Sequence, residues 1–341
     1  MRDIKELDLE QLKETLKVWG QPSFRARQIF SWIYQKGVRD FGRMSDLAVD
    51  LRKKLEEEFS ILDFTVSRRL RSEDGTEKFL FELADKNLIE AVGIPTEDRI
   101  TGCISTQAGC RFSCRFCASG KSGFQRNLTC GEMLGEAWYL KYGSAAGRLT
   151  HIVFMGTGEP LDNYDNLLKA IRIMNSPYSF NIGARRITIS TCGIIPGIKR
   201  LAEEGLQVEL SVSLHAADDK TRTGLMPVSR IYPLGELIKA CRDYARKTNR
   251  QVTFEYVLIK DLNSDLQSAQ KLSTILAGFN NKVNLIPANP VRGMGIEPPN
   301  KLEILLFKDR LLKSGVNVTL RKPRGKDIDA ACGQLRLNSQ P

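Results

Sequence analysis

The stretch Cys110-Arg-Phe-Ser-Cys114-Arg-Phe-Cys117 decides how the rest of the chain is interpreted. Three residues separate its first two cysteines and two residues separate its last two. An ordinary iron–sulfur cubane is held by four thiolates, so a run of three leaves one iron open to a ligand that is not protein. Phe112 and Phe116 flank the cysteines and would restrict solvent access, which influences the reduction potential of a cluster.

A structural zinc site, or a set of unrelated buried thiols, is the simpler alternative for this run. Structural zinc normally takes four nitrogen or sulfur ligands, typically as two spaced pairs. No second pair and no His-x-His sequence follows here. The spacing therefore favours a cluster with one open position.

The composition describes a globular protein that we expect to work in the cytoplasm. With 341 residues, 42% of them hydrophobic, the chain can bury a full core as one large domain or two smaller ones. No run approaches the length of a membrane span, and the N-terminal MRDIKELDLEQLKETLK is charged rather than signal-like. Without a secretion signal, the eight cysteines indicate reduced thiols rather than disulfides.

The charge balance favours a polyanionic partner. The net charge is +11, from 51 basic and 40 acidic residues. Charge of this sign and size is typical of proteins that bind nucleic acid. The alternative is a protein that is basic only because its proteome is basic.

Residues 1–60 are expected to form a small helical domain that binds RNA. An apolar stripe near helical spacing begins the chain, at Leu7, Leu9, Leu12, Leu16 and Trp19. Candidates for phosphate contacts are Arg25, Arg27, Lys36 and Arg39. Trp32 and Tyr34 are available to stack on bases, but we interpret them as core residues. The same core is predicted to include Phe24, Ile29, Phe30 and Ile33.

Residues 61–95 change to a period of two and predict a β-hairpin connection. Phe79–Leu83 and Leu88–Val92 flank Asp85-Lys-Asn87, which is typical hairpin-turn chemistry. Glu90 falls inside the second apolar strand. Periodicity alone leaves open a carboxylate on the solvent face of an edge strand.

Residues 96–320 alternate between strands and helices, which indicates parallel strands with right-handed crossovers. The predicted strands are 101–107, 151–155, 186–191, 208–214, 252–259 and 283–287, with a last one near 317–321. The predicted helices are 130–142, 163–175, 197–204, 233–247, 265–278 and 300–314. Six such units could close partly into an α/β barrel, with the chemistry at the carboxyl ends of the strands.

Small and polar residues follow these strands at the expected end. The loop Met155-Gly-Thr-Gly158-Glu159-Pro160-Leu161 follows the second strand, and its carbonyls and carboxylate can accept hydrogen bonds from an ammonium group. Ser190 ends the third strand, Ser213-Leu214-His215 ends the fourth, and Asn289 follows the sixth. For His215, hydrogen bonding to a ligand is favoured over acid–base work.

The tail, residues 321–341, begins with basic residues and then places Cys332 among small neighbours. Ala330, Ala331 and Gly333 leave its sulfur sterically accessible. By itself this would be an ordinary buried thiol, since a free cysteine usually behaves as a small hydrophobe.

Together these motifs resemble the RlmN/Cfr family of radical S-adenosylmethionine (SAM) methyltransferases, which modify adenine in RNA. The resemblance rests on CISTQAGCRFSCRFCASG, MGTGEPL, SLHA, LIPANP and DIDAACGQL, and it runs from about Phe24 to Leu335. It implies a partial (β/α)6 TIM-like barrel, with a [4Fe-4S] cluster on Cys110, Cys114 and Cys117. The implied SAM-binding residues are Gly158, Glu159, Ser190, Ser213, Leu214, His215 and Asn289.

The resemblance also implies a mechanism with two cysteines and two SAM molecules per turnover. Cys332 would be methylated by one SAM, and a radical from the second would remove hydrogen from that methyl group. The carbon radical would add to adenine and leave the RNA bound to Cys332. Cys103 would release the product through a transient disulfide, and Glu90 would accept the ring proton. Cys130, Cys192 and Cys241 are assigned packing roles.

We therefore expect a monomeric RlmN-type enzyme that methylates carbon 2 of adenine in 23S rRNA and in tRNA beside the anticodon. The enzyme would need an electron donor such as flavodoxin. We expect no membrane partner. The nearest alternative is Cfr-type methylation of carbon 8 of the same ribosomal adenine. Two further alternatives are an RNA-binding protein with a structural cluster and a radical SAM enzyme for a small molecule. RNA binding alone needs none of Cys332, Cys103 and Glu90, so their presence argues against the first of these. The basic N-terminal domain argues against the second.

Overall fold

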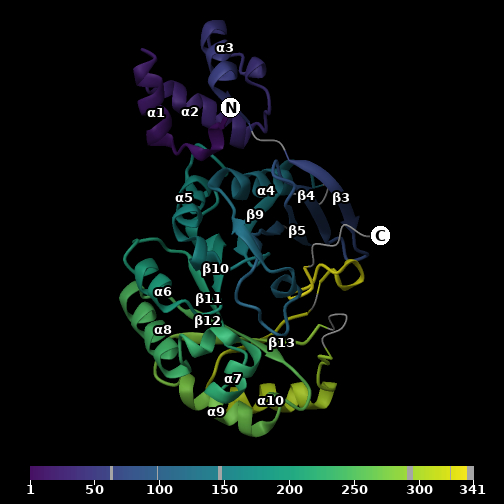
Figure 1. Ribbon diagram of the computed structural model, residues 1–341. Coiled ribbons are helices and arrows are strands. Elements are labelled where there is room, and N and C mark those ends of the chain that lie inside the picture. Colours follow the sequence, from purple (N-terminus) through teal and green to yellow (C-terminus); the bar gives the residue numbers. More distant parts are fainter. Residues whose placement is uncertain (62–63, 98, 145–147, 290–294, 323, 336–341) are drawn as a thin grey trace.

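The computed structural model describes residues 1–61, 64–97, 99–144, 148–289, 295–322 and 324–335. In this part of the chain, a ten-stranded sheet has the order β14-β13-β12-β11-β10-β9-β6-β5-β4-β3 (Figure 1). The seven strands between β14 and β6 in this order are all parallel to one another. They are β6 (Arg99–Cys103), β9 (Leu149–Phe154), β10 (Ile187–Thr191), β11 (Glu209–Ser213), β12 (Val252–Leu258), β13 (Asn281–Pro287) and β14 (Val318–Leu320).

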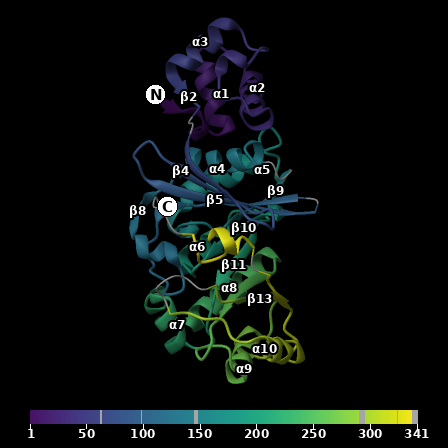
Figure 2. The ribbon, with the colours of Figure 1, turned by 90° about the vertical axis from the view of Figure 1, so that its right-hand side faces the viewer.

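Helices join these parallel strands along their outer side, and Figures 1 and 2 show α8, α9 and α10 curving around the strands. They are α4 (Cys130–Tyr142), α5 (Tyr164–Asn175), α6 (Ile195–Leu201), α7 (Asp219–Leu225), α8 (Leu234–Thr248), α9 (Leu266–Leu276) and α10 (Lys301–Lys313). The predicted partial (β/α)6 barrel is confirmed. The short helix α7 was not predicted.

Alternation along the strands gives the barrel two different faces. In β11, Leu210 and Val212 are fully buried. Ser213 on the other face lines an internal cavity. β12 repeats the pattern, with Phe254 buried in the hydrophobic core and Glu255 lining the cavity. Side chains alternate between the two faces of a strand, so these sequences direct apolar groups to the helices and polar groups to the interior.

The predicted hairpin is confirmed, and it extends the same sheet. β3 (Thr65–Arg71), β4 (Glu77–Glu82) and β5 (Leu88–Thr96) pair antiparallel, and β5 pairs antiparallel with β6. The Asp85 carboxylate accepts a hydrogen bond from the Asn87 backbone N–H at 3.1 Å and so closes the turn between β4 and β5.

The predicted strand 101–107 is wrong at its end. β6 stops at Cys103, and the chain continues into β7 (Gln107–Gly109), which pairs with β8 (Phe124–Asn127) in a separate two-stranded ribbon. The Thr106 and Gln107 N–H groups both donate to the Thr157 carbonyl oxygen, at 2.8 and 3.2 Å. These bonds hold the segment after β6 against the glycine-containing loop that follows β9.

The N-terminal residues form a helical domain above α4 (Figure 2). Its elements are α1 (Leu9–Val18), α2 (Phe24–Phe30), a π-helix (Ser31–Gln35), α3 (Val49–Glu58) and the paired strands β1 (Arg2–Asp3) and β2 (Phe59–Ser60). Tyr34 is core as predicted, whereas Trp32 is half-buried and Phe24, which is 49% exposed, is not core. Trp138 on α4 donates to the Ile33 carbonyl oxygen at 3.1 Å, so the domain is bonded to the barrel.

All four candidate phosphate-binding cations lie over aromatic rings. Arg25 lies over Phe24, Arg27 over Tyr178, Lys36 over Trp32 and Arg39 over Trp138. Arg25 also donates to the Asp46 carbonyl oxygen at 2.8 Å. Their contacts with RNA stay a prediction. No helix of the described segments has both the length and the apolar composition that crossing a membrane requires.

Candidate active site

A cavity opens at the carboxyl ends of the parallel strands, and most of the predicted site residues line it. They are Cys110, Cys114, Cys117, Gly158, Glu159, Ser190, Ser213, His215, Asn289 and Cys332. The cluster loop (residues 110–123), the strand ends and the tail thus meet at one place. Leu214 is instead fully buried in the hydrophobic core. Cys103 and Glu90 are buried beneath the tail, outside the lining of this cavity.

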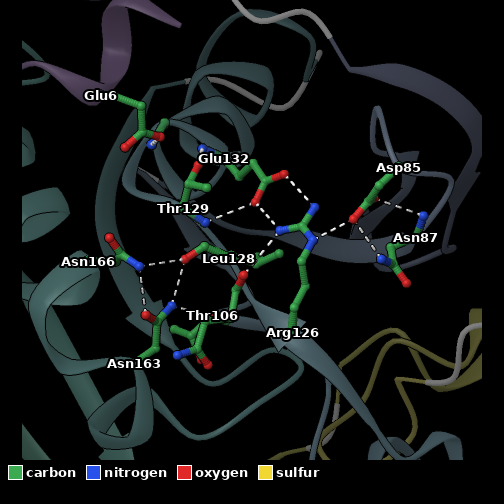
Figure 3. Close-up of polar contacts among 12 residues, drawn as sticks. Glu6, Asp85, Asn87, Thr106, Arg126, Leu128, Thr129, Glu132, Asn163 and Asn166 are labelled. Carbon is green, nitrogen blue, oxygen red and sulfur yellow. Dashed lines mark hydrogen bonds and ion pairs between the residues drawn. The ribbon is translucent and has the colours of Figure 1, made fainter. Parts of the chain in front are cut away.

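The cluster loop is closed at its base by the β7–β8 ribbon, which is itself held by Arg126. Figure 3 shows the Arg126 guanidinium between the hairpin turn and the start of α4. It donates to both carboxylate oxygens of Glu132 at 2.8 Å, and its Nε donates to Asp85. Glu132 also accepts from the Thr129 N–H and belongs to the capping box of α4. One guanidinium therefore joins the ribbon, the hairpin and α4.

Side chains from the start of α5 and the turn before it bind the chain on both sides of the ribbon (Figure 3). The Asn163 amide donates to the carbonyl oxygens of Thr106 and Leu128 at 2.8 and 2.7 Å. Asn166 donates to the Leu128 carbonyl oxygen as well, at 3.2 Å. Because these bonds flank β7 and β8, the segment carrying the three cysteines begins and ends at fixed points.

The three cysteines of the loop have the donor chemistry that an iron–sulfur cluster needs. Burial raises the pKa of Cys110 to about 12 and also raises the pKa of Cys114. A thiolate in such a place is stable when it is bound to a cation, and iron supplies that charge. Within the described residues no three His, Cys, Asp or Glu side chains converge as they would around a single ion. A cluster does not require this, because each thiolate binds a different iron atom.

The glycine-containing loop after β9 approaches the base of the cluster loop closely. Gly158 has a φ of +106°, and a Cβ there would lie 2.6 Å from the Cβ of Gln107, so only glycine fits. The Glu159 carboxylate accepts hydrogen bonds from the N–H groups of Leu161 and Cys192, at 3.0 and 2.6 Å. Burial raises its pKa. Glu159 is therefore held by the backbone at the wall of the cavity.

His215 is placed as a neutral hydrogen-bonding group. It is buried, and its Nδ1 accepts a hydrogen bond from the Val257 N–H at 3.0 Å. Burial, followed by the charge of Arg222, lowers its pKa to about 3. An imidazole that accepts at Nδ1 carries its proton on Nε2, which leaves that atom as a donor. The Phe116 ring contacts it edge-on, with 4.5 Å between centroids.

Arg222 on α7 is a central residue that the sequence analysis missed. It is fully buried and donates to the carbonyl oxygens of Cys192 at 2.8 Å and Leu214 at 3.3 Å and to the Ser229 hydroxyl at 2.5 Å. The guanidinium thus joins the ends of β10 and β11. Cys192, assigned to packing, is buried but also lines the cavity.

Glu255 is a second residue that was not predicted, although the sequence contains a signal for it. It stands inside the apolar strand β12, just as Glu90 stands inside β5. It lines the cavity, accepts from Asn284 at 3.0 Å and forms an ion pair with Arg321 at 3.6 Å. A carboxylate inside an apolar strand could therefore have indicated a site residue at both Glu90 and Glu255.

Cys332 is exposed and reaches the cavity from the tail, which other elements hold in place. Asn289 donates to its carbonyl oxygen at 3.2 Å. The Ala118 N–H donates to the Gly333 carbonyl oxygen at 2.8 Å. A Cβ on Gly333 would lie 2.9 Å from the Phe116 carbonyl oxygen, so the small residue permits this close contact with the cluster loop.

Cys103 and Glu90 lie beneath the tail. Cys103 is buried with Val92, Ala330 and Leu335. Burial, followed by the proximity of Cys332, raises its pKa. Glu90 is buried too, so the alternative of a solvent-exposed carboxylate is wrong. Burial raises the pKa of Glu90 to about 7, although its ion pair with Lys78 at 3.2 Å opposes the shift.

Comparison with known proteins agrees with this architecture. Residues 104–271 match the radical SAM superfamily, and residues 2–61 match the ribosomal RNA large subunit methyltransferase N-terminal domain. The chain is 45% identical to the probable dual-specificity RNA methyltransferase RlmN of Caldanaerobacter subterraneus, with 98% of both chains covered. It is 42% identical to the dual-specificity RNA methyltransferase RlmN of Nautilia profundicola, covering 97% of this chain and 98% of that one. A crystal structure of a radical SAM methyltransferase from Sphaerobacter thermophilus superposes with a TM-score of 0.95 and 43% identity, over 98% of this chain and 99% of that chain.

Proposed function

The chain belongs to the RlmN family of radical SAM RNA methyltransferases, and on this basis we propose that it methylates carbon 2 of adenine. The proposed substrates are the adenine at the peptidyl-transferase centre of 23S rRNA and the adenine beside the tRNA anticodon. The names of the relatives, which specify dual specificity, support two RNA substrates. The observation that carries the proposal is the position of Cys332 at the cavity, above the buried Cys103 and Glu90.

The cavity offers a place for both groups that radical SAM enzymes use. Cys110, Cys114 and Cys117 would hold a [4Fe-4S] cluster, which Phe112 and Phe116 shield from solvent. SAM would lie against a set of backbone and polar groups on the neighbouring wall, from Gly158, Glu159, Ser190, Ser213, His215 and Asn289. When bound, the cluster and two SAM molecules per turnover supply a methyl group and the radical that activates it. We further propose that the enzyme is a monomer and that a protein such as flavodoxin supplies its electrons.

The chemistry of adenine explains why a thiol carrier is needed. Carbon 2 lies between two ring nitrogens and is electron-poor, so it does not attack a methyl sulfonium as a nucleophile. A carbon radical on an S-methyl group of Cys332 can add to it and bind the RNA covalently to the protein. The exposure of Cys332 at the cavity suits it to meet both SAM and the base.

The two residues beneath the tail would complete the reaction. Glu90 would take the hydrogen of carbon 2 as a proton, and its pKa of about 7 is suitable for a general base near neutral pH. The adduct would also have to lose one electron, which a bound cluster could accept. The Cys103 thiolate would then bond to the Cys332 sulfur, the bond between that sulfur and the transferred carbon would break, and the carbon would take a proton to become the methyl group. The products are methylated RNA and a disulfide that two electrons must reduce before the next turnover.

Chromatography of digested RNA with mass detection tests the proposal. RNA treated with the reconstituted enzyme should yield 2-methyladenosine, which shares its mass with 8-methyladenosine but separates from it against standards. A product that runs only as 8-methyladenosine would assign the chain to carbon-8 chemistry, as in the Cfr branch. Methylation of 23S rRNA fragments without methylation of tRNA would remove the second substrate.

A further inference from the structure

A single buried lysine connects the candidate base with the tail that carries Cys332. Lys78 lies on β4, and its Nζ is 3.2 Å from Glu90 Oε1 on the neighbouring strand β5. The same Nζ donates to the Asp329 carbonyl oxygen at 3.1 Å, three residues before Cys332. The side chains of Lys78 and Glu90 are only 9% and 3% exposed. The ammonium is therefore shared between a strand and a segment about 250 residues further along the chain.

The other bonds of the tail divide into two groups, and Lys78 belongs to the first. On the hairpin side, Ser72 donates to the Asp327 carboxylate at 2.6 Å, and the Gly325 N–H donates to Asp74 at 3.0 Å. On the cavity side, the bonds from Asn289 and Ala118 reach Cys332 and the residue after it. Lys78 differs from these other donors to the described tail because its ammonium also contacts Glu90, the candidate base.

We propose that Lys78 is a positioning residue, which fixes the Glu90 carboxylate and the Cys332-bearing tail relative to each other so that base and methyl carrier meet the same adenine. The inference rests on the proposed function for the roles of Glu90 and Cys332. The link itself, from strand to tail, is a property of the protein without substrate. It can therefore be tested whether or not the chemistry is as proposed.

Stability alone is a weak explanation for this ion pair. A buried ion pair often contributes no more to folding than well-packed apolar side chains of similar volume. Its geometry, by contrast, restricts two groups at once, because one ammonium orients a carboxylate and a backbone carbonyl. The Oε2 atom of Glu90 has no hydrogen-bond partner among the described residues, so one carboxylate oxygen stays free to take a proton.

Loss of the ammonium would act on Glu90 and on the tail together. Among the residues that the structure describes, two ionisable groups face Glu90, Lys78 from β4 and Asp329 from the tail, and they act in opposite directions on its pKa. Without Lys78, burial and Asp329 would both favour protonated Glu90. An opposite charge at this distance lowers the pKa of a carboxyl group by about 1–3 units, so its removal should raise the pKa by a similar amount. The Asp329 carbonyl oxygen would at the same time lose its donor.

The test compares Lys78→Met with Lys86→Met in the full-length, cluster-loaded protein. Both changes remove one positive charge from the same hairpin, but Lys86 is exposed and pairs with Glu82 at the surface. Hydrogen exchange of residues 325–335 is measured without RNA, and single-turnover methylation is measured from about pH 6 to about pH 9. In Lys78→Met, tail exchange should accelerate at least several-fold, and the midpoint of the pH profile should move up by about 1–3 units. Lys86→Met should match the wild type in both.

Each other outcome decides against part or all of the inference. Tail exchange and a pH midpoint that both stay at the wild-type values would overturn it. A change in only one of them would mean that Lys78 serves the tail or the base but does not couple them. If the wild-type protein methylates no RNA, the proposed function fails, and the exchange measurement still decides whether Lys78 holds the tail.

A second variant keeps the test valid if Lys78→Met does not fold. Lys78→Met combined with Glu90→Gln replaces the ion pair by two neutral side chains of similar size, so that no buried charge is left unpaired. Tail exchange in this double variant should still exceed that of the single Glu90→Gln variant, because only the former has lost the donor to Asp329. Equal exchange in the two would overturn the link between Lys78 and the tail.

Discussion

The cluster loop and the C-terminal tail bring reactive sulfur atoms to one cavity, but the protein holds them in opposite ways. The loop that carries Cys110, Cys114 and Cys117 is closed by a β-ribbon, and side chains of Arg126 and Asn163 fix its base (Figure 3). The described part of the tail has one short 3-10 helix, Lys326–Ile328, as its regular structure. Other elements hold it through separate hydrogen bonds to its backbone and to the Asp327 carboxylate, and through apolar contacts of Ala330 and Leu335.

This difference matches the two kinds of work that the sulfur atoms are proposed to do. Cluster ligands must keep fixed distances, so a frame with many cooperating bonds suits them. A carrier sulfur must meet a SAM methyl group, an adenine and the Cys103 thiol in turn. A typical internal hydrogen bond contributes only about 0.5–1.5 kcal/mol net, so a segment held by single bonds can change position one bond at a time.

The largest effect is expected from the cluster loop. Cys114→Ala removes one of the three proposed thiolate ligands, and we expect complete loss of the cluster chromophore and of reductive SAM cleavage. The measurements are the iron and sulfide content after anaerobic reconstitution and the amount of 5′-deoxyadenosine formed. Cys130→Ala is the control, because Cys130 is also a cysteine inside the fold but lies on α4, outside the cavity lining. A Cys114→Ala protein that keeps a full cluster and cleaves SAM would contradict the site assignment.

The two remaining reactive cysteines should fail differently from Cys114 and from each other. Cys332→Ala should keep the cluster but transfer no methyl group to RNA, because the carrier is missing. Cys103→Ala should still form the bond to adenine and then stall, since the thiol that releases the product is gone. Denaturing gels with labelled RNA should show a covalent protein–RNA band for Cys103→Ala.

The double variant provides the control for this second prediction. Cys103→Ala combined with Cys332→Ala should show no such band, because the attachment point is absent. Non-additive behaviour of this kind is expected of residues that act as one unit. Normal turnover by Cys103→Ala, without an adduct, would return Cys103 to the role of a buried strand residue.

Glu90 should produce a partial and pH-dependent loss. Burial raises its pKa to about 7, so the basic form predominates only above that value, and the rate of single-turnover methylation should rise with pH through about 7. Glu90→Gln removes the proton acceptor and should slow this step by about 10²–10⁴-fold and flatten the profile. Glu82→Gln, on the partner strand of the same hairpin, is the control. A Glu90→Gln enzyme with the wild-type pH profile would exclude Glu90 as the base.

The sequence was sufficient for features that depend on nearby residues. Three cysteines within eight residues predict a ligand set before any folding is known, and the structure places all three at one cavity. Alternation in Phe79–Leu83 and Leu88–Val92 predicted the hairpin strands, because period-two patterning is a local property. The positions of Ser190, Ser213 and His215 at one mouth followed from the rule that parallel strands align their carboxyl ends.

Features that depend on distant partners could not be predicted. Arg222 has a polar, helix-like sequence context, and nothing nearby shows that its guanidinium is buried against Cys192 and Leu214. Lys78 looks like an ordinary strand lysine until Asp329 is brought beside it. The expected strand 101–107 was too long for the same reason, because Thr157 binds the chain after β6 and turns it into the ribbon.

The contacts that fix the base of the cluster loop should contribute to the free energy of unfolding of the whole protein. Arg126→Met removes the bidentate contact with Glu132 and the contact with Asp85, leaving two carboxylates without their charged partner. Hydrogen bonds between charged groups contribute about 1.5–3 kcal/mol, so the free energy of unfolding should fall by about 1–3 kcal/mol. The measurement is the urea midpoint at unchanged m-value, with Arg242→Met on the outer helix α8 as the control. An unchanged midpoint would show that the ribbon, and not Arg126, holds the base of the loop.

The smallest global effect is expected from the hairpin-side anchor of the tail. Asp327 accepts hydrogen bonds from the Ser72 hydroxyl and the Glu73 N–H, which lower its pKa, and its side chain is solvent-exposed. Asp327→Asn keeps the shape but replaces one acceptor oxygen by a donor, so one of the two bonds should be lost. Because the bond joins only the tail to the turn before β4, the urea midpoint should stay at the wild-type value. Hydrogen exchange of residues 325–335 should nevertheless accelerate, whereas Asp309→Asn on the exposed face of α10 should change neither. A fall in the midpoint as large as that of Arg126→Met would mean that the tail is built into the fold as firmly as the cluster loop, and a carrier that moves among three partners would then need another explanation.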